Sequence, residues 1–213
     1  IYSTYMIPYL EDKYEMLRML SNAIKAVYAS VYYRDSKAYM TATSNVIDQE
    51  KMAVILQEVV GKSYHDRYYP SFSGVLRSLN YYPIGEETVE EGIVSLAVGL
   101  GKYIVDGGLT LRVSPYHPHQ VLQTSEMDIA LKETQTQFYS LDLRDIEDDF
   151  KIDVGFNIIK QNVREADKDN SLNLLASTFD PVDQVIRDGL YPGGRKIISF
   201  CGLLQQGVFP LPE

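Results

Sequence analysis

A pair of glycines directly after an apolar run is the feature of this sequence that most directly suggests chemistry. Residues 92–98 read Gly-Ile-Val-Ser-Leu-Ala-Val and lead into Gly99, Leu100, Gly101 and Lys102. Because glycine has no Cβ, its backbone can approach another molecule closely, and its amide groups can then bind an anion such as a phosphate. The two glycines would equally suit a tight turn between a strand and a helix, so both interpretations stay open.

Four apolar runs separated by turn residues indicate the sheet that would hold this turn in place. Short runs of aliphatic and β-branched residues bounded by glycine or proline predict buried strands. The four runs are 52–60, 72–79, 92–98 and 109–114. Apolar residues at helical spacing predict a helix over 11–33, and a shorter helix is expected over 36–43.

Weaker patterns follow elsewhere in the chain. Polar and aromatic residues predict a loop between the first two strands, and a second hydrophilic stretch predicts another loop. Alternation and apolar runs predict three further strands and one short helix. The loops are 61–71 and 166–171, the strands 138–143, 154–163 and 196–201, and the helix 172–179.

The composition is that of an ordinary globular protein and excludes several functions. The 213 residues are 45% hydrophobic and 23% charged, which allows a sizeable core. The net charge of −9 argues against a nucleic-acid partner, because neutralising phosphates needs clustered lysine and arginine. No apolar run is long enough to cross a membrane, and no secretory signal is present. The one cysteine, Cys201, excludes an internal disulfide framework and lies in an apolar run, which predicts a buried thiol in a cytoplasmic protein.

Candidate metal ligands are sparse. His117 and His119 are two residues apart, but a zinc site needs three or four ligands. The acidic residues between Glu86 and Glu91 are typical of a solvated face. The sequence therefore assigns no metal site and no catalytic residue.

The ordered set of motifs resembles the nucleotide-binding half of the phosphoenolpyruvate synthase and pyruvate phosphate dikinase family. The motifs are Met-Ala-Val-Ile-Leu-Gln-Glu-Val-Val at 52–60, Ser-Gly-Val at 73–75, Ala-Val-Gly-Leu-Gly at 97–101 and Val-Asp-Gly at 105–107. The resemblance implies an α+β, ATP-grasp-like fold in which a mixed or antiparallel sheet packs against helices. It implies that residues 1–118 are part of the nucleotide-binding region. Residues 119–213 would be an additional α+β segment of the same region, truncated at both ends.

The resemblance also implies an adenine site. By it, Gln57, Glu58, Val59 and Val60 form the connecting segment whose backbone contacts the adenine edge, through the carbonyl of Glu58 and the amide of Val60. A site with apolar walls and a few placed polar groups suits a small ligand. A central strand without a ligand is the alternative.

The phosphates would be held by Gly99, Gly101, Lys102 and Arg112. The guanidinium of Arg112 resembles one that the dikinases carry, and it could hold two phosphate oxygens at once, although an exposed strand arginine is the alternative. Lys102 departs from the family, which usually has a glutamate directly after Gly-Leu-Gly. A carboxylate can bind Mg²⁺, whereas a protonated lysine can only pair with phosphate, with a Coulomb attraction of about 4 kcal/mol at ~4 Å and an effective dielectric constant near 20.

The activity implied by the resemblance is that of a pyruvate, water dikinase. Such an enzyme is a phosphotransferase that converts ATP, pyruvate and water into phosphoenolpyruvate, AMP and phosphate. It uses Mg²⁺ and a phosphohistidine domain of the same chain as partner. We expect this chain to be an internal fragment that binds ATP weakly or not at all. The alternatives are a non-catalytic regulatory or partner-binding module and a dikinase with another acceptor.

Overall fold

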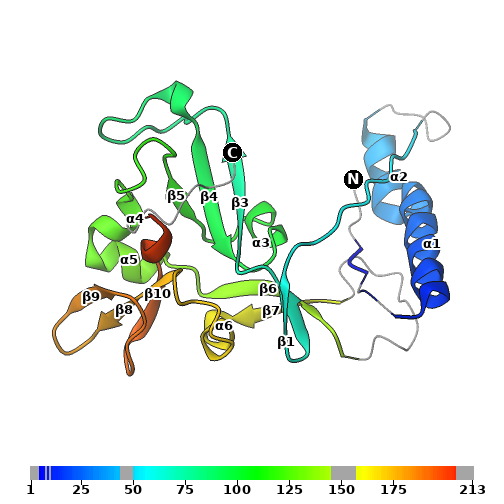
Figure 1. Ribbon diagram of the computed structural model, residues 1–213. Helices are drawn as coiled ribbons and strands as arrows, with labels where there is room; N and C mark the ends of the chain where they lie inside the picture. Colours follow the sequence, from blue (N-terminus) through cyan, green and yellow to red (C-terminus); the bar gives the residue numbers. More distant parts are fainter. Residues whose placement is uncertain (1–4, 8, 10, 44–49, 145–156, 205–213) are drawn as a thin grey trace. The chain divides into compact units, whose positions relative to one another are not determined.

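The computed structural model describes residues 5–7, 9, 11–43, 50–144 and 157–204 (Figure 1). The chain forms two compact units. The first comprises Ile1–Val59 and Leu141–Ile158, and the second Val60–Ser140 and Ile159–Glu213. Helices and antiparallel sheets occur together, which confirms the predicted α+β class. None of the helices in the described ranges has the length and hydrophobicity that crossing a bilayer requires.

The described part of the first unit is mainly helical. Helix α1 spans Lys13–Ala29, a 3₁₀ turn η1 spans Ser30–Tyr32, and α2 spans Arg34–Ala42. Asp12 begins α1 as its N-cap, because its carboxylate accepts a hydrogen bond from the amide of Tyr14 at 2.8 Å. Both predicted helices are confirmed.

A three-stranded antiparallel sheet in the second unit contains three of the four predicted strands. Its order is β3 (Phe72–Arg77), β4 (Ile93–Val98) and β5 (Leu111–Val113). Side chains alternate between the two faces of a strand. One face of β4 therefore gives Val94, Leu96 and Val98 to the core of this unit.

Two further sheets and several short helices make up most of the rest of the second unit. The remaining strands are β1 (Lys62–Tyr64), β2 (Arg67–Tyr69), β6 (Gln137–Asp142) and β7 (Ile158–Asn162) in one sheet, and β10 (Arg195–Ile198), β8 (Ala176–Asp180) and β9 (Val185–Asp188) in the other, each in spatial order. The last residues of β6 and the first residue of β7 are assigned to the first unit. The helices are η3 (Val89–Glu91), α3 (Lys102–Val105), α4 (Leu122–Ser125), α5 (Met127–Glu133), α6 (Val163–Lys168) and α7 (Cys201–Leu204).

One hydrophobic core joins these sheets. The rings of Tyr69 and Phe138 lie 4.9 Å apart, and Phe72 packs edge-on against Phe200 at 5.8 Å. Three of these rings are fully buried, so the hairpin β1–β2, strand β6 and the residues before α7 share one interior. Cys201 is 7% exposed, which confirms the buried thiol.

The predicted buried strand over 52–60 is wrong. Residues 50–61 have no regular secondary structure, and the side chains of Ile55, Leu56 and Val60 are 87%, 65% and 80% exposed. Strand formation depends on packing against a neighbouring strand, which β-branched composition alone does not supply.

Two loop predictions and one helix prediction are also wrong, in whole or in part. The stretch 61–71 contains the hairpin β1–β2, which turns where His65 adopts a φ of +55°. Helix α6 (Val163–Lys168), which the side chain of Asn162 caps at its start, covers the first half of the predicted loop over 166–171, and residues 169–171 form a turn. The predicted helix over 172–179 does not form: residues 172–175 make a turn, and residues 176–179 lie in strand β8. Of the predicted strand over 154–163, the part from Ile158 is confirmed as β7, and residues 154–156 lie outside the described residues.

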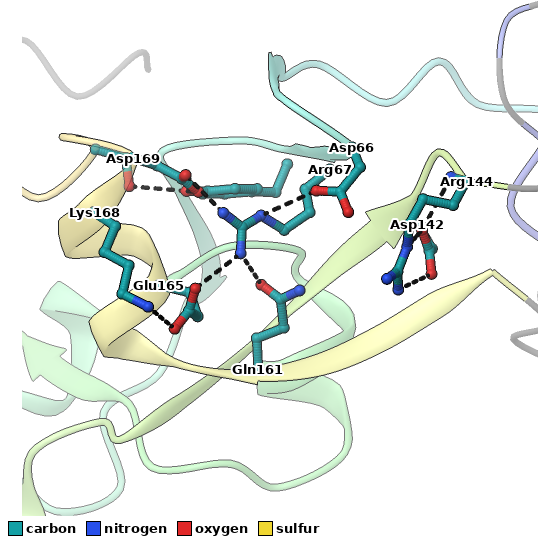
Figure 2. A network of polar contacts seen from close by, with 10 residues as sticks. Asp66, Arg67, Asp142, Arg144, Gln161, Glu165, Lys168 and Asp169 are labelled. Atoms are coloured by element: carbon teal, nitrogen blue, oxygen red, sulfur yellow. Dashed lines mark hydrogen bonds and ion pairs between the residues drawn. The ribbon is translucent and has the colours of Figure 1, made fainter.

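A nearly buried arginine ties the hairpin β1–β2 to β7 and α6 (Figure 2). The Arg67 side chain is 12% exposed, and its Nη2 donates to Oδ1 of Asp169, which is 1% exposed, at 2.7 Å. Its Nη1 donates to Gln161 at 3.2 Å and to Glu165 at 3.3 Å. Burial disfavours the arginine charge, yet the carboxylates of Asp169 and Glu165 raise the Arg67 pKa above its ordinary value. The remaining oxygen of Asp169 accepts the hydroxyl of Tyr69 at 2.7 Å, so each oxygen of this buried carboxylate has a partner.

Removing Arg67 tests whether this pair holds the second unit together. We expect Arg67→Ala to lower the free energy of unfolding by about 3–5 kcal/mol, because Asp169 would stay buried without its cation. Arg187→Ala is the matched control: Arg187 pairs with Asp183 on an exposed surface, where a pair contributes at most about 1 kcal/mol. Urea denaturation followed by circular dichroism measures both. Equal losses in the two variants would contradict the assignment.

Candidate functional site

The glycine turn joins β4 to α3, as Figure 1 shows, and Gly99 is required there by the fold itself. Gly99 has a φ of +83°, and a Cβ on it would lie 2.6 Å from the carbonyl oxygen of Tyr139. That oxygen accepts the amide of Leu100 at 3.0 Å, and the hydroxyl of Ser73 donates to the Gly99 carbonyl at 2.7 Å. The missing side chain of Gly99 therefore lets the turn pack against β6.

Gly101 stands in a different environment. Its φ of −58° and ψ of −19° suit any residue, and a Cβ there would meet Ser73 at an ordinary contact distance of 3.5 Å. The fold thus places no steric demand for glycine at this position. Because the amide of Leu100 is already used by β6, the turn offers another molecule its surface around Gly101 and Lys102 rather than around Gly99.

Lys102 belongs to a small charged cluster around Tyr139. Its Nζ pairs with the carboxylate of Asp106, one helical turn later, at 3.0 Å. The carboxylate of Asp106 also acts on the Tyr139 hydroxyl, and Nζ of Lys160 lies 6.0 Å from the centre of the Tyr139 ring. Burial raises the pKa of Tyr139, the hydrogen bond to Asp106 raises it further, and the charge of Lys102 opposes both. The ring of Tyr103 packs edge-on against the ring of Tyr139, with 5.8 Å between the two ring centres.

Arg112 lies on the same sheet as the turn but is not adjacent to it. It pairs across the strands with Ser95, which is four residues before Gly99, so roughly 13 Å of strand separates them. The Arg112 side chain donates to Oδ1 of Asn80 at 3.2 Å, and its own amide donates to Gln123 at 2.7 Å. The guanidinium is on the exposed position of β5.

The predicted site residues divide between the two units. Gly99, Gly101, Lys102, Arg112 and Val60 belong to the second unit, and the structure brings the first three together in one turn. The other three predicted residues belong to the first unit, and their part in an adenine site stays a prediction. They are Gln57, Glu58 and Val59.

Sequence reasoning missed several partners of this turn. Asp106 could have been found from its spacing of four residues from Lys102 on a short helix. Tyr139 and Lys160 could not, because each comes from a distant strand, β6 or β7. Buried Asn80 was missed too, although it organises the loop after β3 by donating to Glu87 at 2.8 Å.

The acidic stretch is only partly a solvated face. Glu87 is 9% exposed and accepts hydrogen bonds from Asn80 and from the amide of Ile84. Glu91 caps η3 together with Thr88 and pairs with His117 at 3.4 Å. Over the described ranges, His, Cys, Asp and Glu side chains form no group of three that could hold a metal ion. With a lysine at position 102, these residues do not fit a protein-bound Mg²⁺.

Comparison with known proteins gave one match. The family model described as pyruvate phosphate dikinase, AMP/ATP-binding domain, matches residues 2–153. Neither the curated proteins nor the solved structures yielded a match. The matched residues include the glycine turn, Lys102 and Arg112.

Replacing each glycine of the turn by alanine should show which of the two the fold requires. We expect Gly99→Ala to lower the free energy of unfolding by at least about 2 kcal/mol, because it combines a left-handed backbone with a clash against β6. Gly101→Ala should be neutral or slightly stabilising, since its backbone is already compatible with alanine. Thermal and urea unfolding of both variants measure this difference. A Gly101→Ala loss as large as that of Gly99→Ala would show that the turn is packed differently.

The Tyr139 phenol reports on the charged cluster. We expect its pKa to lie above the ordinary value, to fall in Asp106→Asn and to rise in Lys102→Ala, because the carboxylate favours the neutral phenol and the ammonium favours the phenolate. Carbon NMR of ring-labelled tyrosine, titrated from neutral to alkaline pH, follows this group. Lys168→Ala removes an exposed helix lysine that pairs with Glu165 and serves as the control, with no expected change. Shifts in the opposite directions would refute the contacts.

Proposed function

Because the chain belongs to the pyruvate phosphate dikinase AMP/ATP-binding domain family, we propose that it forms part of the ATP-binding region of a phosphotransferase. In this proposal the phosphates of ATP lie against Gly101 and Lys102. The resemblance assigns contact with the adenine base to the backbone of residues 57–60, and we keep this as a separate part of the proposal.

The observation that carries the phosphate assignment is that Gly101 stands directly before Lys102 in the turn. Gly101 has no side chain to cover the backbone of the turn, although a Cβ at this position would make only an ordinary contact with Ser73. The ammonium of Lys102 is held by an exposed pair with Asp106, 3.0 Å away, which contributes at most about 1 kcal/mol. A triphosphate carries several negative charges and forms stronger charge-assisted hydrogen bonds, so it can displace Asp106 at little cost.

The adenine assignment is supported by the conformation of the connecting segment. Residues 50–61 lie in no strand ladder, and the side chains of Gln57 and Glu58 are exposed. Val54 and Val59 are half-buried, which gives the segment some apolar contact surface. The carbonyl of Glu58 and the amide of Val60 would then contact the base edge, as the resemblance implies.

The reaction that we propose is a dikinase reaction of the phosphoenolpyruvate synthase type, with pyruvate as acceptor and a phosphohistidine domain of the same chain as intermediate carrier. Transfer of a phosphoryl group depends on positive charge held around the phosphate oxygens. Lys102 would supply that charge directly, and Arg112 would hold oxygens further along the sheet. A magnesium ion would come with the nucleotide, since the described residues do not fit it.

A second candidate function is a non-catalytic nucleotide-sensing module. It is favoured by Lys102, which replaces the glutamate expected there and is paired with Asp106. The two candidates differ in turnover. Phosphorus NMR of the full-length protein with Mg-ATP and pyruvate should show AMP and phosphate for a dikinase, whereas ATP that binds without forming AMP favours the module.

Nucleotide binding by this chain should be weak and should depend on Lys102. We expect Mg-ATP to perturb the amide NMR signals of Gly101 and Lys102 with a dissociation constant weaker than about 100 μM. Lys102→Ala should weaken binding about tenfold, a change of roughly 1.4 kcal/mol. Gly101→Ala should weaken it as well, although the variant stays folded.

Lys168→Ala is the control, because it removes a comparable helix lysine of the same unit without touching the turn. Unchanged binding in that variant together with a loss in Lys102→Ala supports the phosphate assignment. Absence of saturable changes at Gly101 and Lys102, or equal losses in both lysine variants, would overturn it. Micromolar affinity would contradict the expectation of weak binding.

A further inference from the structure

The first unit contains a cavity of its own, separate from the residues proposed for the nucleotide. The cavity has a volume of about 270 Å³ and is lined by residues of η1, α2 and the segment that begins at Glu50. All of its lining residues belong to the first unit. The volume lies just below the usual range of small-molecule pockets, so a compact ligand is the appropriate size.

The inner wall of the cavity is apolar. Val31 and Met40 are 7% and 8% exposed, and half-buried Met52 contributes a second methionine. Tyr39 lines the same cavity and is 56% exposed, which places its ring at the opening. Methionine side chains adapt their shape and make favourable contacts with aromatic rings. This wall therefore suits an aromatic or aliphatic body.

The polar side chains of the cavity mainly accept hydrogen bonds. Ser30 donates its hydroxyl proton to the carbonyl of Val27 at 2.7 Å, and Ser36 donates its own to the carbonyl of Ser30 at 2.7 Å. Both protons are thus used, and the serine oxygens can only accept. Glu50 adds a carboxylate, which is also an acceptor and is the charged side chain of the lining. Tyr39 adds a hydroxyl that can donate or accept. A ligand that donates hydrogen bonds and carries positive charge matches this set.

We propose that this cavity binds a small organic cation, a protonated primary amine on an aromatic or aliphatic body. The ammonium lies at Glu50 and the body lies between Met40, Met52 and Val31. The same acceptor-rich lining repels phosphates, so the cavity is not a second nucleotide site. This inference goes beyond the proposed ATP binding and does not depend on it.

Methionine methyl NMR gives a direct test, because six methionines are present and only two line the cavity. We expect phenethylammonium to shift the methyl signals of Met40 and Met52 in a saturable way while leaving those of Met19 and Met127 in place. The neutral isostere 2-phenylethanol should bind at least about tenfold more weakly, and phenylacetate should not bind. Equal responses to the three probes, or no saturable shift of Met40 and Met52, would overturn the proposal.

Substitution of Glu50 tests the charge separately. Glu50→Gln keeps the shape of an exposed side chain, and we expect it to weaken phenethylammonium binding about tenfold. Glu11→Gln removes another exposed carboxylate of the first unit that does not line the cavity, and it should leave binding unchanged. Equal affinities in the two variants would refute the role of Glu50. Unaltered signals of Met16 and Met19 in α1 verify that both variants are folded.

Discussion

The ion pair between Arg67 and Asp169 is the interaction on which the second unit depends most. Asp169 is almost completely buried, and a carboxylate in that position is tolerable only because Arg67 and Tyr69 satisfy its two oxygens. The pair joins the hairpin β1–β2 near the start of the unit to helix α6 about a hundred residues later. The hairpin in turn places Tyr69 against Phe138 of β6, and β6 supports the glycine turn through Tyr139. The position of the proposed phosphate-binding turn therefore depends on a contact made far from it.

Residues beyond the region that the family model matches belong to the same structural unit as the glycine turn. The family model ends at residue 153, yet residues after that point supply Asp169 and much of the hydrophobic core, including Leu172, Ile198 and Phe200. Thr134 also accepts the amide of Ile198 at 2.8 Å, which ties β10 to the matched region. Because one interior is built from both parts, the later strands are structural components of the unit that carries the glycine turn.

The two glycines of the turn differ in what the fold requires of them. Gly99 meets a demand of the fold, because β6 occupies the space that a side chain would need. Gly101 meets no such demand, and it stands beside a lysine whose charge is held by a weak, exposed pair. A position that the fold leaves open beside a cation that is easily released is a reasonable arrangement for binding phosphate. In the proposed function, Lys102 would supply positive charge directly where the resemblance implies a metal-binding glutamate.

The sequence by itself determined the elements whose signal is local. Helical periodicity located α1, and apolar runs between turn residues located β3, β4 and β5, because these patterns reflect which face of an element is buried. It also indicated the glycine turn and the family. The tertiary structure alone decided which strands found partners: the longest of the four apolar runs, 52–60, is in no strand ladder, whereas the polar stretch 61–71 forms a hairpin that Arg67 and Tyr69 anchor to α6. It also decided that Gly99 serves packing, that Lys102 pairs with Asp106 and that Tyr139 and Lys160 join them. These contacts link residues that are far apart along the chain, and no local pattern encodes such distances, because they arise only when separate elements bury their surfaces against one another.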